Sequence, residues 1–429
     1  MYADGDTIFA VASGAGRAAV TLLRLSGPHA ITLLDALCRR PQPRVAALRA
    51  LKVSGEILDR ALVLWLPGPG SYTGEDSVEL HLHGGRAVLS AVSEALVGLG
   101  ARPAEAGEFT RRAFLNGRMD LVEAEAVADL IEAETAAQRQ QALRQMEGGL
   151  GAVLHGWTDR LTRLLAQQEA LIDFPDEDLP PEVEAALMAE IGALIREIST
   201  MLHDGRRGER LRDGLVFAVV GPPNAGKSTL VNALAAREVA IVSATPGTTR
   251  DVLEVRLDLG GVPVTLLDTA GLRDTTDEIE AEGVRRAMAR MADADLVLLV
   301  AESGAGTFED VGDLPKILIR TKSDTGGNGP GASHVSARTG YGMDHLRDTL
   351  AQAAQSMTQA AGPPPLTRAR HRAALTEAVA RLQTASTAAL AELRGEDLRL
   401  ALRAIGRVTG AVGVEDILDS VFRQFCIGK

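Results

Sequence analysis

Residues 221–228 read GPPNAGKS and match the spacing G-x-x-x-x-G-K-[ST] of a loop that binds nucleotide phosphates. The loop follows an apolar run at 215–220 and opens a segment, STLVNALAA, whose composition favours a helix. Glycines let backbone amides surround an anion, and a helix N-terminus adds positive potential. Lys227 is then placed to reach the β- and γ-phosphates, and the Ser228 hydroxyl to bind Mg²⁺. This segment therefore predicts binding of a nucleoside triphosphate.

Two later segments predict that the base is guanine. ILIRTKSD at 317–324 ends an apolar run with Lys322 and Asp324. The Asp324 carboxylate can accept hydrogen bonds from the guanine N1–H and exocyclic amine, a donor pair that adenine lacks. HVSAR at 334–338 would supply a backbone amide to the guanine O6. The first motif usually begins with Asn, whereas this chain has Thr321; we expect guanine selectivity to be retained, and the effect on affinity stays open.

The segments VTLLDTAG (264–271) and GTTRD (247–251) predict the remaining parts of a site that hydrolyses GTP. Asp268 ends an apolar run and would hold the Mg²⁺ shell. The backbone at Gly271 would sense the γ-phosphate. The two threonines of GTTRD belong to a switch segment that can order on Mg²⁺ and γ-phosphate.

A water-orienting group is missing from its usual place. Ras-like proteins carry a Gln directly after DTAG, and here that position is Leu272, which cannot orient water. Asn224 and the hydroxyls and carbonyls of 243–249 are candidates to hold a monovalent cation where an arginine finger acts. Glu280, in DTTDEIEAEG, is the candidate to orient water through a bridge. The alternative, that Glu280 is a solvated surface carboxylate, stays open.

The elements around these motifs predict four parts of the chain. Residues 1–118 mix the strands DTIFAVA, AAVTLLRLSG, LKVSGEIL, RALVLWLPG and DSVELHLHGG with the helices HAITLLDALC and GRAVLSAVSEALVGLGA, which indicates an α+β domain. Residues 119–212 are predicted to form part of a helical bundle, with a strong helix former that has few breakers, DLVEAEAVADLIEAETAAQRQQALRQ, and an apolar stripe along 183–201. Residues 357–429 are helical again. Between them, 213–356 form an inserted Ras-like α/β domain with a parallel sheet. Its predicted strands are 215–220, 262–267, 296–301, 316–320 and 333–337.

Composition narrows the class of protein. The net charge of −12 argues against broad, non-specific nucleic-acid binding. The segment LTRARHR at 366–372 is either a local basic patch or a solvated helix face. No apolar run approaches the ~20 residues that span a bilayer, and the N-terminus lacks the features of a signal peptide. Cys38 and Cys426 make no disulfide framework, so we expect a cytoplasmic protein with reduced thiols and no membrane partner.

Longer stretches carry a resemblance to a known family. They are DTIFAVASGAGRAAVTLLRLSG, PGSYTGEDSVELHLHGG, GEFTRRAFLNGRMDLVEAEAVADLI, GPPNAGKSTLVNAL, PGTTRDVLE, LLDTAGLRDTTDEIEAEG and the terminal FCIGK. On these motifs the chain resembles, over essentially its whole length, the MnmE (TrmE) family of bacterial tRNA-modification GTPases. The resemblance implies an N-terminal domain that forms a homodimer and binds 5-formyltetrahydrofolate, or a related tetrahydrofolate, as one-carbon donor. It implies G domains that dimerise in a K⁺-dependent manner during GTP hydrolysis. It further implies a heterotetramer with an FAD-dependent MnmG-type partner, which installs a carboxymethylaminomethyl- or aminomethyl-type group at C5 of the wobble uridine (position 34) of certain tRNAs.

The resemblance also implies roles for single residues. The Mg²⁺ ligands would be Ser228 and Thr249, and the K⁺ ligands would be Asn224, Ser243, Thr245 and Thr248. The catalytic residues would be Glu280 as the water-orienting carboxylate, Lys227 and Cys426. The folate contacts would be Arg24, Glu79, Arg118 and Lys429, although the residues alone, without the resemblance, favour ordinary ion pairs. The GTP site would consist of Asn224, Ala225, Gly226, Lys227, Ser228, Thr229, Ser243, Thr245, Gly247, Thr248, Thr249, Asp268, Thr269, Ala270, Gly271, Thr321, Lys322, Asp324, Ser336, Ala337 and Arg338.

Three interpretations of the terminal FCIGK can be compared. A prenylation box fits poorly, because Gly428 and Lys429 are the wrong residues for it. Cys426 can also be a small hydrophobe that caps the last helix. In the third interpretation, favoured by the resemblance, Val421, Phe422 and Phe425 anchor the last helix and Gly428 permits a close backbone approach. Lys429 and Cys426 would then lie beside the folate site, and whether Cys426 is a nucleophile or structural stays open.

Two other functions share the nucleotide motifs. A ribosome-assembly GTPase would carry the same loops, but such proteins append a compact RNA-binding module, and here a long helical segment precedes residue 213. A nucleotide-gated scaffold without catalysis would be favoured by the loss of a key motif residue. Only Thr321 departs from the guanine-reading pattern.

Overall fold

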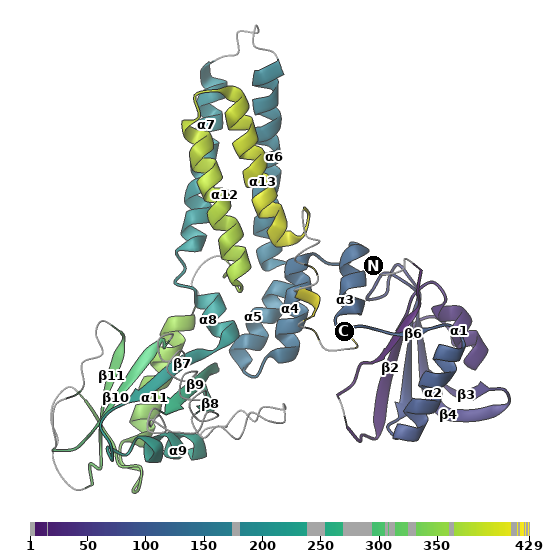
Figure 1. The fold of residues 1–429 in the computed structure, drawn as a ribbon, viewed down its shortest axis with the longest axis horizontal. Coiled ribbons are helices and arrows are strands. Elements are labelled where there is room, and N and C mark those ends of the chain that lie inside the picture. Colours follow the sequence, from purple (N-terminus) through teal and green to yellow (C-terminus); the bar gives the residue numbers. More distant parts are fainter. Residues whose placement is uncertain are drawn as a thin grey trace, which may run out of the picture. The chain divides into compact units, whose positions relative to one another are not determined.

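The structure of the chain is a computed structural model. It describes residues 5–14, 16–173, 181–237, 254–268, 294–304, 308, 314–324, 332–359, 364–412, 418, 421–423, 425 and 428. The chain divides into two compact units. The first consists of Met1–Ala128, Met146–Arg163 and Arg399–Lys429, and the second of Asp129–Gln145 and Leu164–Leu398 (Figure 1).

The first unit contains a six-stranded sheet in the order β3-β4-β5-β2-β1-β6. All neighbours pair antiparallel except β1 and β6, which are parallel. Two helices, α1 (Ala30–Leu37) and α2 (Arg86–Gly98), share a buried apolar cluster with one face of the sheet. This arrangement confirms the predicted α+β class. The strands are β1 (Ile8–Val11), β2 (Val20–Ser26), β3 (Ala47–Val53), β4 (Glu56–Leu66), β5 (Ser77–His83) and β6 (Arg102–Pro103).

Alternation along the strands decides which side chains face the helices. In β5, Val78, Leu80 and Leu82 are buried, whereas Glu79 and His81 between them are only partly buried. Because successive strand residues point to opposite faces, Glu79 and His81 lie on the face that α1 and α2 leave open. The predicted strands LKVSGEIL and RALVLWLPG are corrected: β3 and β4 form a single hairpin whose turn contains Ser54 and Gly55.

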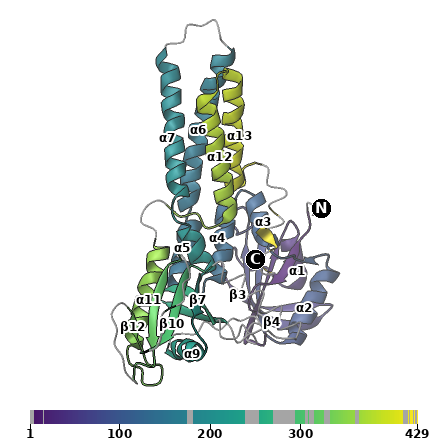
Figure 2. The ribbon, with the colours of Figure 1, turned by 60° about the vertical axis from the view of Figure 1, so that its left-hand side comes forward.

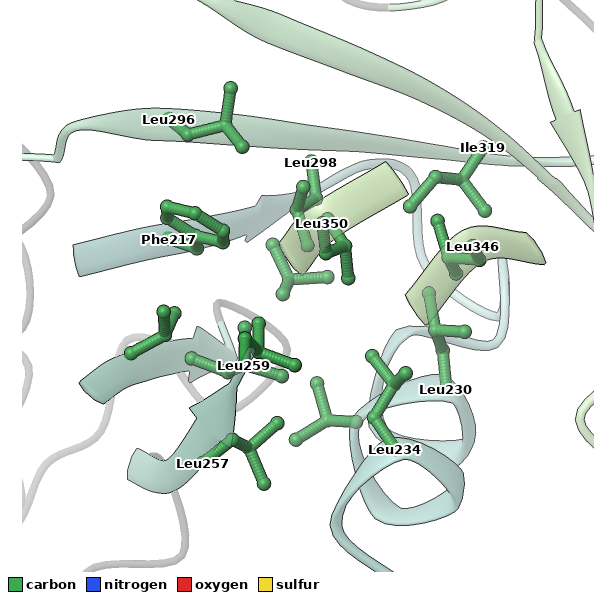
Figure 3. Packing of buried hydrophobic residues seen from close by; sticks show 14 of the residues in the cluster. Phe217, Leu230, Leu234, Leu257, Leu259, Leu296, Leu298, Ile319, Leu346 and Leu350 are labelled. Carbon is green, nitrogen blue, oxygen red and sulfur yellow. The ribbon is translucent and has the colours of Figure 1, made fainter. Parts of the chain in front are cut away.

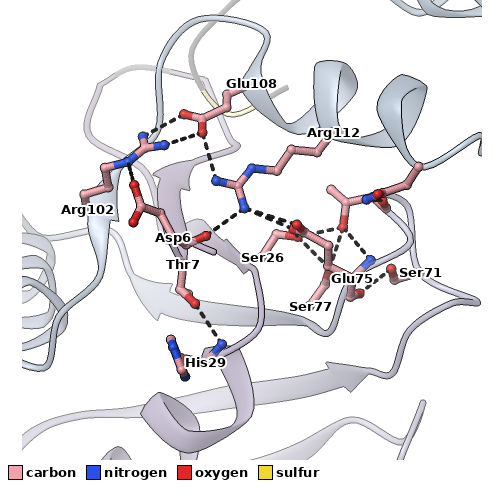
Figure 4. Close-up of polar contacts among 12 residues, drawn as sticks. Asp6, Thr7, Ser26, His29, Ser71, Glu75, Ser77, Arg102, Glu108 and Arg112 are labelled. Carbon is pink, nitrogen blue, oxygen red and sulfur yellow. Dashed lines mark hydrogen bonds and ion pairs between the residues drawn. The ribbon is translucent and has the colours of Figure 1, made fainter. Parts of the chain in front are cut away.

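A buried carboxylate ties α3 (Glu108–Leu115) to the sheet of the first unit. Glu108 accepts from Arg102 at 2.6 Å and from Arg112 at 3.0 Å, and its side chain is 2% exposed (Figure 4). Arg112 also donates to the Asp6 carbonyl at 2.8 Å and to Glu75 at 3.2 Å. The network therefore joins the start of the chain, the loop before β5 and α3.

Replacing Glu108 by Gln is expected to weaken the first unit at neutral pH and to flatten its loss of stability in acid. Burial raises the pKa of the Glu108 carboxyl. Hydrogen bonds from Arg102, the Glu105 amide and Arg112 together lower this pKa by more than burial raises it, so the folded-state pKa lies below the usual 4.5. A depressed carboxyl pKa adds stability that is present above about pH 4.5 and disappears as the pH falls through the folded-state pKa. The neutral variant should lose about 1–3 kcal/mol at pH 7.

Urea unfolding followed by tryptophan fluorescence measures this effect, because both tryptophans, Trp65 and Trp157, lie in the first unit. Glu56→Gln, an exposed carboxyl on β4, is the matched control and should unfold like the wild type. An unchanged acid limb in Glu108→Gln would show that the network does not carry the pH dependence.

The C-terminal residues pack into the same unit. Val421, Phe422 and Phe425 are buried against Leu121 and its neighbours in α4 (Leu121–Glu132), as the sequence predicts for these three side chains. Gly428 has a φ of 101°, and a Cβ added there would lie 2.2 Å from the Val11 carbonyl oxygen of β1. Glycine is therefore required at 428 for the chain end to approach β1. Cys426 and Lys429 lie outside the described residues.

The second unit contains a helical part. Along α7 (Pro181–Leu202) the predicted stripe is confirmed, with Val183 half-buried and the remaining positions buried. The helix α12 (Ala369–Thr387) packs along α7 (Figure 2). The same unit contains residues 164–173 at the end of α6 (Gly149–Asp173) and residues 391–398 at the start of α13 (Ala391–Thr409). The buried stripe positions are Leu187, Ile191, Leu194, Ile198 and Met201.

Ion pairs join the two ends of the predicted insertion. Asp129 accepts from Arg212 at 2.9 Å and from Arg368 at 2.7 Å. Arg372 pairs with Glu209 at 3.2 Å, and Glu209 lies in α8 (Arg207–Asp213), directly before the second sheet. The segment 366–372 is thus neither a basic patch nor a solvated face, because Arg368 and Arg372 both form ion pairs with buried carboxylates.

The second sheet has the order β12-β11-β10-β7-β9-β8 and is parallel except for the β8–β9 pair. Its apolar residues pack against α9 (Lys227–Arg237) and α11 (Met343–Thr358) in one core (Figure 3). The inserted α/β class is confirmed, and β8 is an edge strand that the sequence prediction missed. The strands are β7 (Leu215–Val220), β8 (Glu254–Leu259), β9 (Val262–Asp268), β10 (Leu296–Glu302), β11 (Lys316–Thr321) and β12 (Ser333–His334).

Candidate nucleotide site

The predicted phosphate loop connects β7 to α9 at the carboxyl edge of the second sheet. Gly221 passes so close to β10 that an added Cβ would lie 2.0 Å from the Val300 carbonyl oxygen. Only glycine fits there, because the clash would be with backbone. The turn is closed by the Ala225 amide, which donates to the Pro222 carbonyl at 3.3 Å. The loop therefore presents its amides at the start of an 11-residue helix, where anions are stabilised.

Lys227 is buried within this loop, with 7% of the residue exposed. Its ammonium donates to the Gly221 carbonyl at 2.6 Å and to the Pro222 carbonyl at 3.0 Å. Two carbonyl groups thus hold a full positive charge at the mouth of the loop. Ser228, Thr229 and Asn224 are exposed in the same segment, so their polar groups are open to a ligand.

Asp268 ends β9 and lies beside the phosphate loop. It pairs in register with Val219 of β7, the residue before Val220 and the loop. The carboxyl ends of parallel strands meet at one edge of a sheet, where ligands of such folds bind. A carboxylate, a serine hydroxyl and an amide-lined loop at one edge form a donor set that suits Mg²⁺ and phosphate.

A pocket of about 290 Å³ opens next to the phosphate loop. All eight of its lining residues belong to the site predicted from sequence, and they come from three separate segments. The structure therefore brings the phosphate loop and the two guanine-reading segments together. The lining residues are Gly226, Thr229, Thr321, Lys322, Asp324, Ser336, Ala337 and Arg338.

Asp324 is kept ionised in this pocket. A hydrogen bond from the Ser336 hydroxyl lowers the pKa of the Asp324 carboxyl most, and its own backbone amide and Arg338 lower it further. Arg338 donates to the carboxylate at 3.1 Å from a side chain that is otherwise largely exposed. Lys322 has its ammonium 2.9 Å from Glu302. An ionised carboxylate can only accept hydrogen bonds, which suits it to a ligand edge that donates two.

Nine of the predicted nucleotide-site residues lie outside the part of the chain that the structure describes. They include Thr249, proposed for Mg²⁺, three of the four residues proposed for K⁺, and Glu280. The nine are Ser243, Thr245, Gly247, Thr248, Thr249, Thr269, Ala270, Gly271 and Glu280.

The predicted folate residues fall on the first unit. Arg24 of β2 and Glu79 of β5 are direct cross-strand partners, and their side chains pair at 3.0 Å. The Arg24 guanidinium also lies over the Tyr72 ring at 5.6 Å. Arg118 comes near the same loop as Tyr72, because a Cβ added at Gly74 would contact its side-chain carbons at 3.3 Å.

Sequence reasoning missed two neighbours of the Arg24–Glu79 pair. Tyr72 donates or accepts a hydrogen bond with Thr110 at 2.8 Å, and His81 lies 3.9 Å from Glu79. Strand alternation could have found His81, because it lies two residues beyond Glu79 on the same face of β5. Tyr72 sits in a glycine-rich turn, and its ring packs against the buried cluster of Ile8, Ala10, Ala104 and Phe109. The described helices include none that is long and apolar enough to cross a membrane.

Comparison with known proteins covers almost the whole chain. A model of the GTP-binding protein TrmE N-terminus matches residues 7–118, and a model of the MnmE helical domain matches residues 121–426. A protein of Granulibacter bethesdensis is 56% identical over 437 residues, with 99% of each chain covered. One of Gluconacetobacter diazotrophicus is 58% identical over 432 residues, with 98% of each covered. Both relatives are named tRNA modification GTPase MnmE. The chain therefore belongs to the MnmE family.

Proposed function

We propose that the chain hydrolyses GTP and that this hydrolysis serves the modification of the wobble uridine of certain tRNAs at C5. The observation that carries the first half is the convergence of the phosphate loop, Asp268 and Asp324 at one edge of the second sheet. The second half is supported by the relatives, which are named for tRNA modification; the wobble uridine and its C5 are what the resemblance of the motifs implies.

On phosphate binding, Lys227 exchanges its two loop carbonyls for the β- and γ-phosphate oxygens. The exchange is favourable because charge-assisted contacts to phosphate are stronger than those to neutral carbonyls. The Ser228 hydroxyl and Thr249 are the proposed Mg²⁺ ligands, and Asp268 holds the water shell of the ion. When bound, the metal would neutralise the negative charge that develops on the phosphoryl group.

Asp324 selects guanine. Its ionised carboxylate accepts from N1–H and the exocyclic amine, while the segment that contains Ser336 and Ala337 offers a backbone amide to O6. The low pKa of the Asp324 carboxyl supports this role, because the acceptor stays charged at every physiological pH. Lys322, Arg338 and the remaining predicted nucleotide residues complete the proposed site.

Leu272 follows DTAG, so the water must be oriented by another group. We propose that Glu280 does so and that Asn224, Ser243, Thr245 and Thr248 hold a K⁺ ion between two G domains. Asn224 supports this proposal, because it is exposed in the phosphate loop, before α9 begins at Lys227.

GTP hydrolysis in KCl and in NaCl at equal ionic strength tests this proposal. We expect the rate in KCl to be at least about tenfold higher, because a cation that replaces an arginine finger stabilises the transition state. GDP affinity should be equal in the two salts and serves as the control. Equal hydrolysis rates would contradict the K⁺ site while leaving the GTP site intact.

We further propose that Arg24, Glu79, Arg118 and Lys429 bind a tetrahydrofolate, such as the 5-formyl form, as one-carbon donor. A cation suits the glutamate tail of folate, and a carboxylate suits the N–H groups of its pterin. The Arg24–Glu79 pair supplies both at 3.0 Å on the face of the sheet opposite α1 and α2. The seat of Gly428 against β1 supports a chain end that reaches this domain.

Removal of residues 426–429 is therefore expected to abolish wobble-uridine modification and to leave GTP hydrolysis nearly unchanged. The deletion takes away Cys426 and Lys429, the proposed catalytic thiol and folate contact, without touching the second sheet. Nucleoside analysis of tRNA and phosphate release measure the two activities on one preparation. A truncated chain that still modifies tRNA would contradict the role of the chain end.

The remaining proposals concern assembly. We propose a division into 1–118, 119–212, 213–356 and 357–429, a homodimer through the first domain, and a heterotetramer with an FAD-dependent MnmG-type protein. The facing pair Leu48 and Leu62 supports the homodimer, because both are exposed on neighbouring strands, at 66% and 40%. Light scattering of the chain alone and of its mixture with such a protein tests both assemblies.

A further inference from the structure

Thr321 ends β11 between the phosphate loop and the base pocket. Its side chain lines the pocket, and the residue is only 5% exposed. The hydroxyl oxygen lies 2.5 Å from the Ala225 carbonyl oxygen and 3.3 Å from the Ala301 carbonyl oxygen. One small polar group thus connects the end of β11 to the middle of the phosphate loop.

The hydroxyl has a single proton, and both of its neighbours are carbonyl oxygens that can only accept. The proton is therefore committed to the protein backbone, and Thr321 has no donor left for a ligand. Guanine presents N7 and O6 as acceptors on one edge. A carboxamide at this position would carry two N–H donors, so it could hold the loop and still donate to the base. Threonine can do only the first.

We propose that Thr321 is a positioning residue, which ties the phosphate loop to β11 and does not read the base. The inference rests on the proposed binding of guanine nucleotides and adds how the base is read. Guanine is recognised through its N1–H, its amine and O6, and N7 contributes nothing through this side chain. Asp324, which accepts from the base, can only accept and therefore cannot serve N7 either.

The tie acts on the phosphates because of where Ala225 sits. Its carbonyl accepts from Thr321, and its amide closes the loop on Pro222. Gly226 and Lys227 follow directly, so a loose Ala225 would displace the amides and the ammonium that meet the phosphates. Gly226 also packs on Thr321, since a Cβ built there would lie 3.7 Å from the hydroxyl oxygen.

Binding of GDP, GMP and 7-deaza-GDP to the full-length chain tests the inference, with 7-deaza-GDP lacking the N7 acceptor. The wild type should bind GDP and 7-deaza-GDP within about twofold of each other. Thr321→Val has nearly the same shape but no hydroxyl, and leaves the Ala225 carbonyl without its donor. It should weaken GDP about fivefold to twentyfold and leave the GDP to 7-deaza-GDP ratio unchanged. Its effect on GMP should be smaller, because GMP lacks the β-phosphate.

Two further variants complete the test. Thr321→Ser keeps the hydroxyl and should restore GDP binding to within about twofold of the wild type. Thr321→Asn adds N–H donors and should create a preference for GDP over 7-deaza-GDP of about fivefold or more. Thermal unfolding followed by circular dichroism checks that each variant is folded.

The outcomes separate this inference from the proposed function. A wild type that prefers GDP over 7-deaza-GDP about fivefold, with the preference lost in Thr321→Val, would show that Thr321 reads the base and would overturn the inference alone. A folded Thr321→Val with wild-type GDP affinity would overturn the tie. A wild type that binds no guanine nucleotide would overturn the proposed function and the inference together.

Discussion

Alanine in place of Lys227 is expected to slow GTP hydrolysis at least about a hundredfold, the usual cost of removing one preorganised donor from a transition state. The ammonium is already held at the mouth of the phosphate loop by the Gly221 and Pro222 carbonyls. On phosphate binding it exchanges these carbonyls for phosphate oxygens, so it is already in place when charge develops on the phosphoryl group. Phosphate release at saturating GTP in KCl measures the effect.

Lys52→Ala is the matched control, because Lys52 is exposed on β3 in the other unit and should leave hydrolysis unchanged. Circular dichroism checks that the Lys227 variant folds. A folded Lys227→Ala chain that hydrolyses GTP within threefold of the wild type would show that the loop is not the phosphate site.

Asn in place of Asp324 is expected to change the base preference of the chain from guanine to xanthine. The neutral amide donates where the carboxylate accepted, so it repels the guanine amine and suits the carbonyl that xanthine carries at that position. GTP affinity should fall at least about a hundredfold, and XTP should bind better than GTP. Competition of GTP and XTP for a fluorescent nucleotide measures the exchange.

Asp348→Asn provides the control for the Asp324 variant, since Asp348 is an exposed carboxyl of α11 that pairs only locally with Arg347. It should keep the wild-type preference for GTP. If Asp324→Asn also kept that preference, the pocket beside the phosphate loop would not be the base site.

The residues of the pocket could be predicted because short motifs encode them. Each motif places its polar side chains directly after a buried strand, and parallel strands bring their ends together. All residues that line the pocket were named from the short motifs together with the family resemblance that they carry. The glycine at 221 could also be predicted from the motif, because the backbone of a phosphate loop must pass close to other backbone.

Local signals explain two omissions in the elements. The stretch 120–145 was identified only as a strong helix former, and the structure divides it into α4 and α5 (Ala136–Met146). Thr135 and Gln138 bond reciprocally across the start of α5, with the Thr135 amide on Gln138 at 3.2 Å and the Gln138 amide on Thr135 at 3.4 Å. This capping box was readable as T-x-x-Q. The edge strand β8 could likewise have been predicted, because polar and apolar residues alternate directly before the Gly260–Gly261 turn.

Other contacts had no local signal. Thr321 meets Ala225 across 96 positions of sequence, and Arg368 meets Asp129 across 239. Charge and spacing cannot pair residues so far apart without the fold. For that reason Thr321 could be described from the sequence only as a departure from Asn, whereas the structure shows its hydrogen bond to the Ala225 carbonyl.

The nucleoside composition of tRNA from a strain that lacks this chain tests the central claim most directly. The strain should lose the modified wobble uridine, the wild-type chain should restore it, and the Lys227→Ala chain should not, because we propose that GTP hydrolysis drives the modification. Wobble uridines that stay modified without the chain, or that the Lys227 variant restores as well as the wild type, would contradict the account.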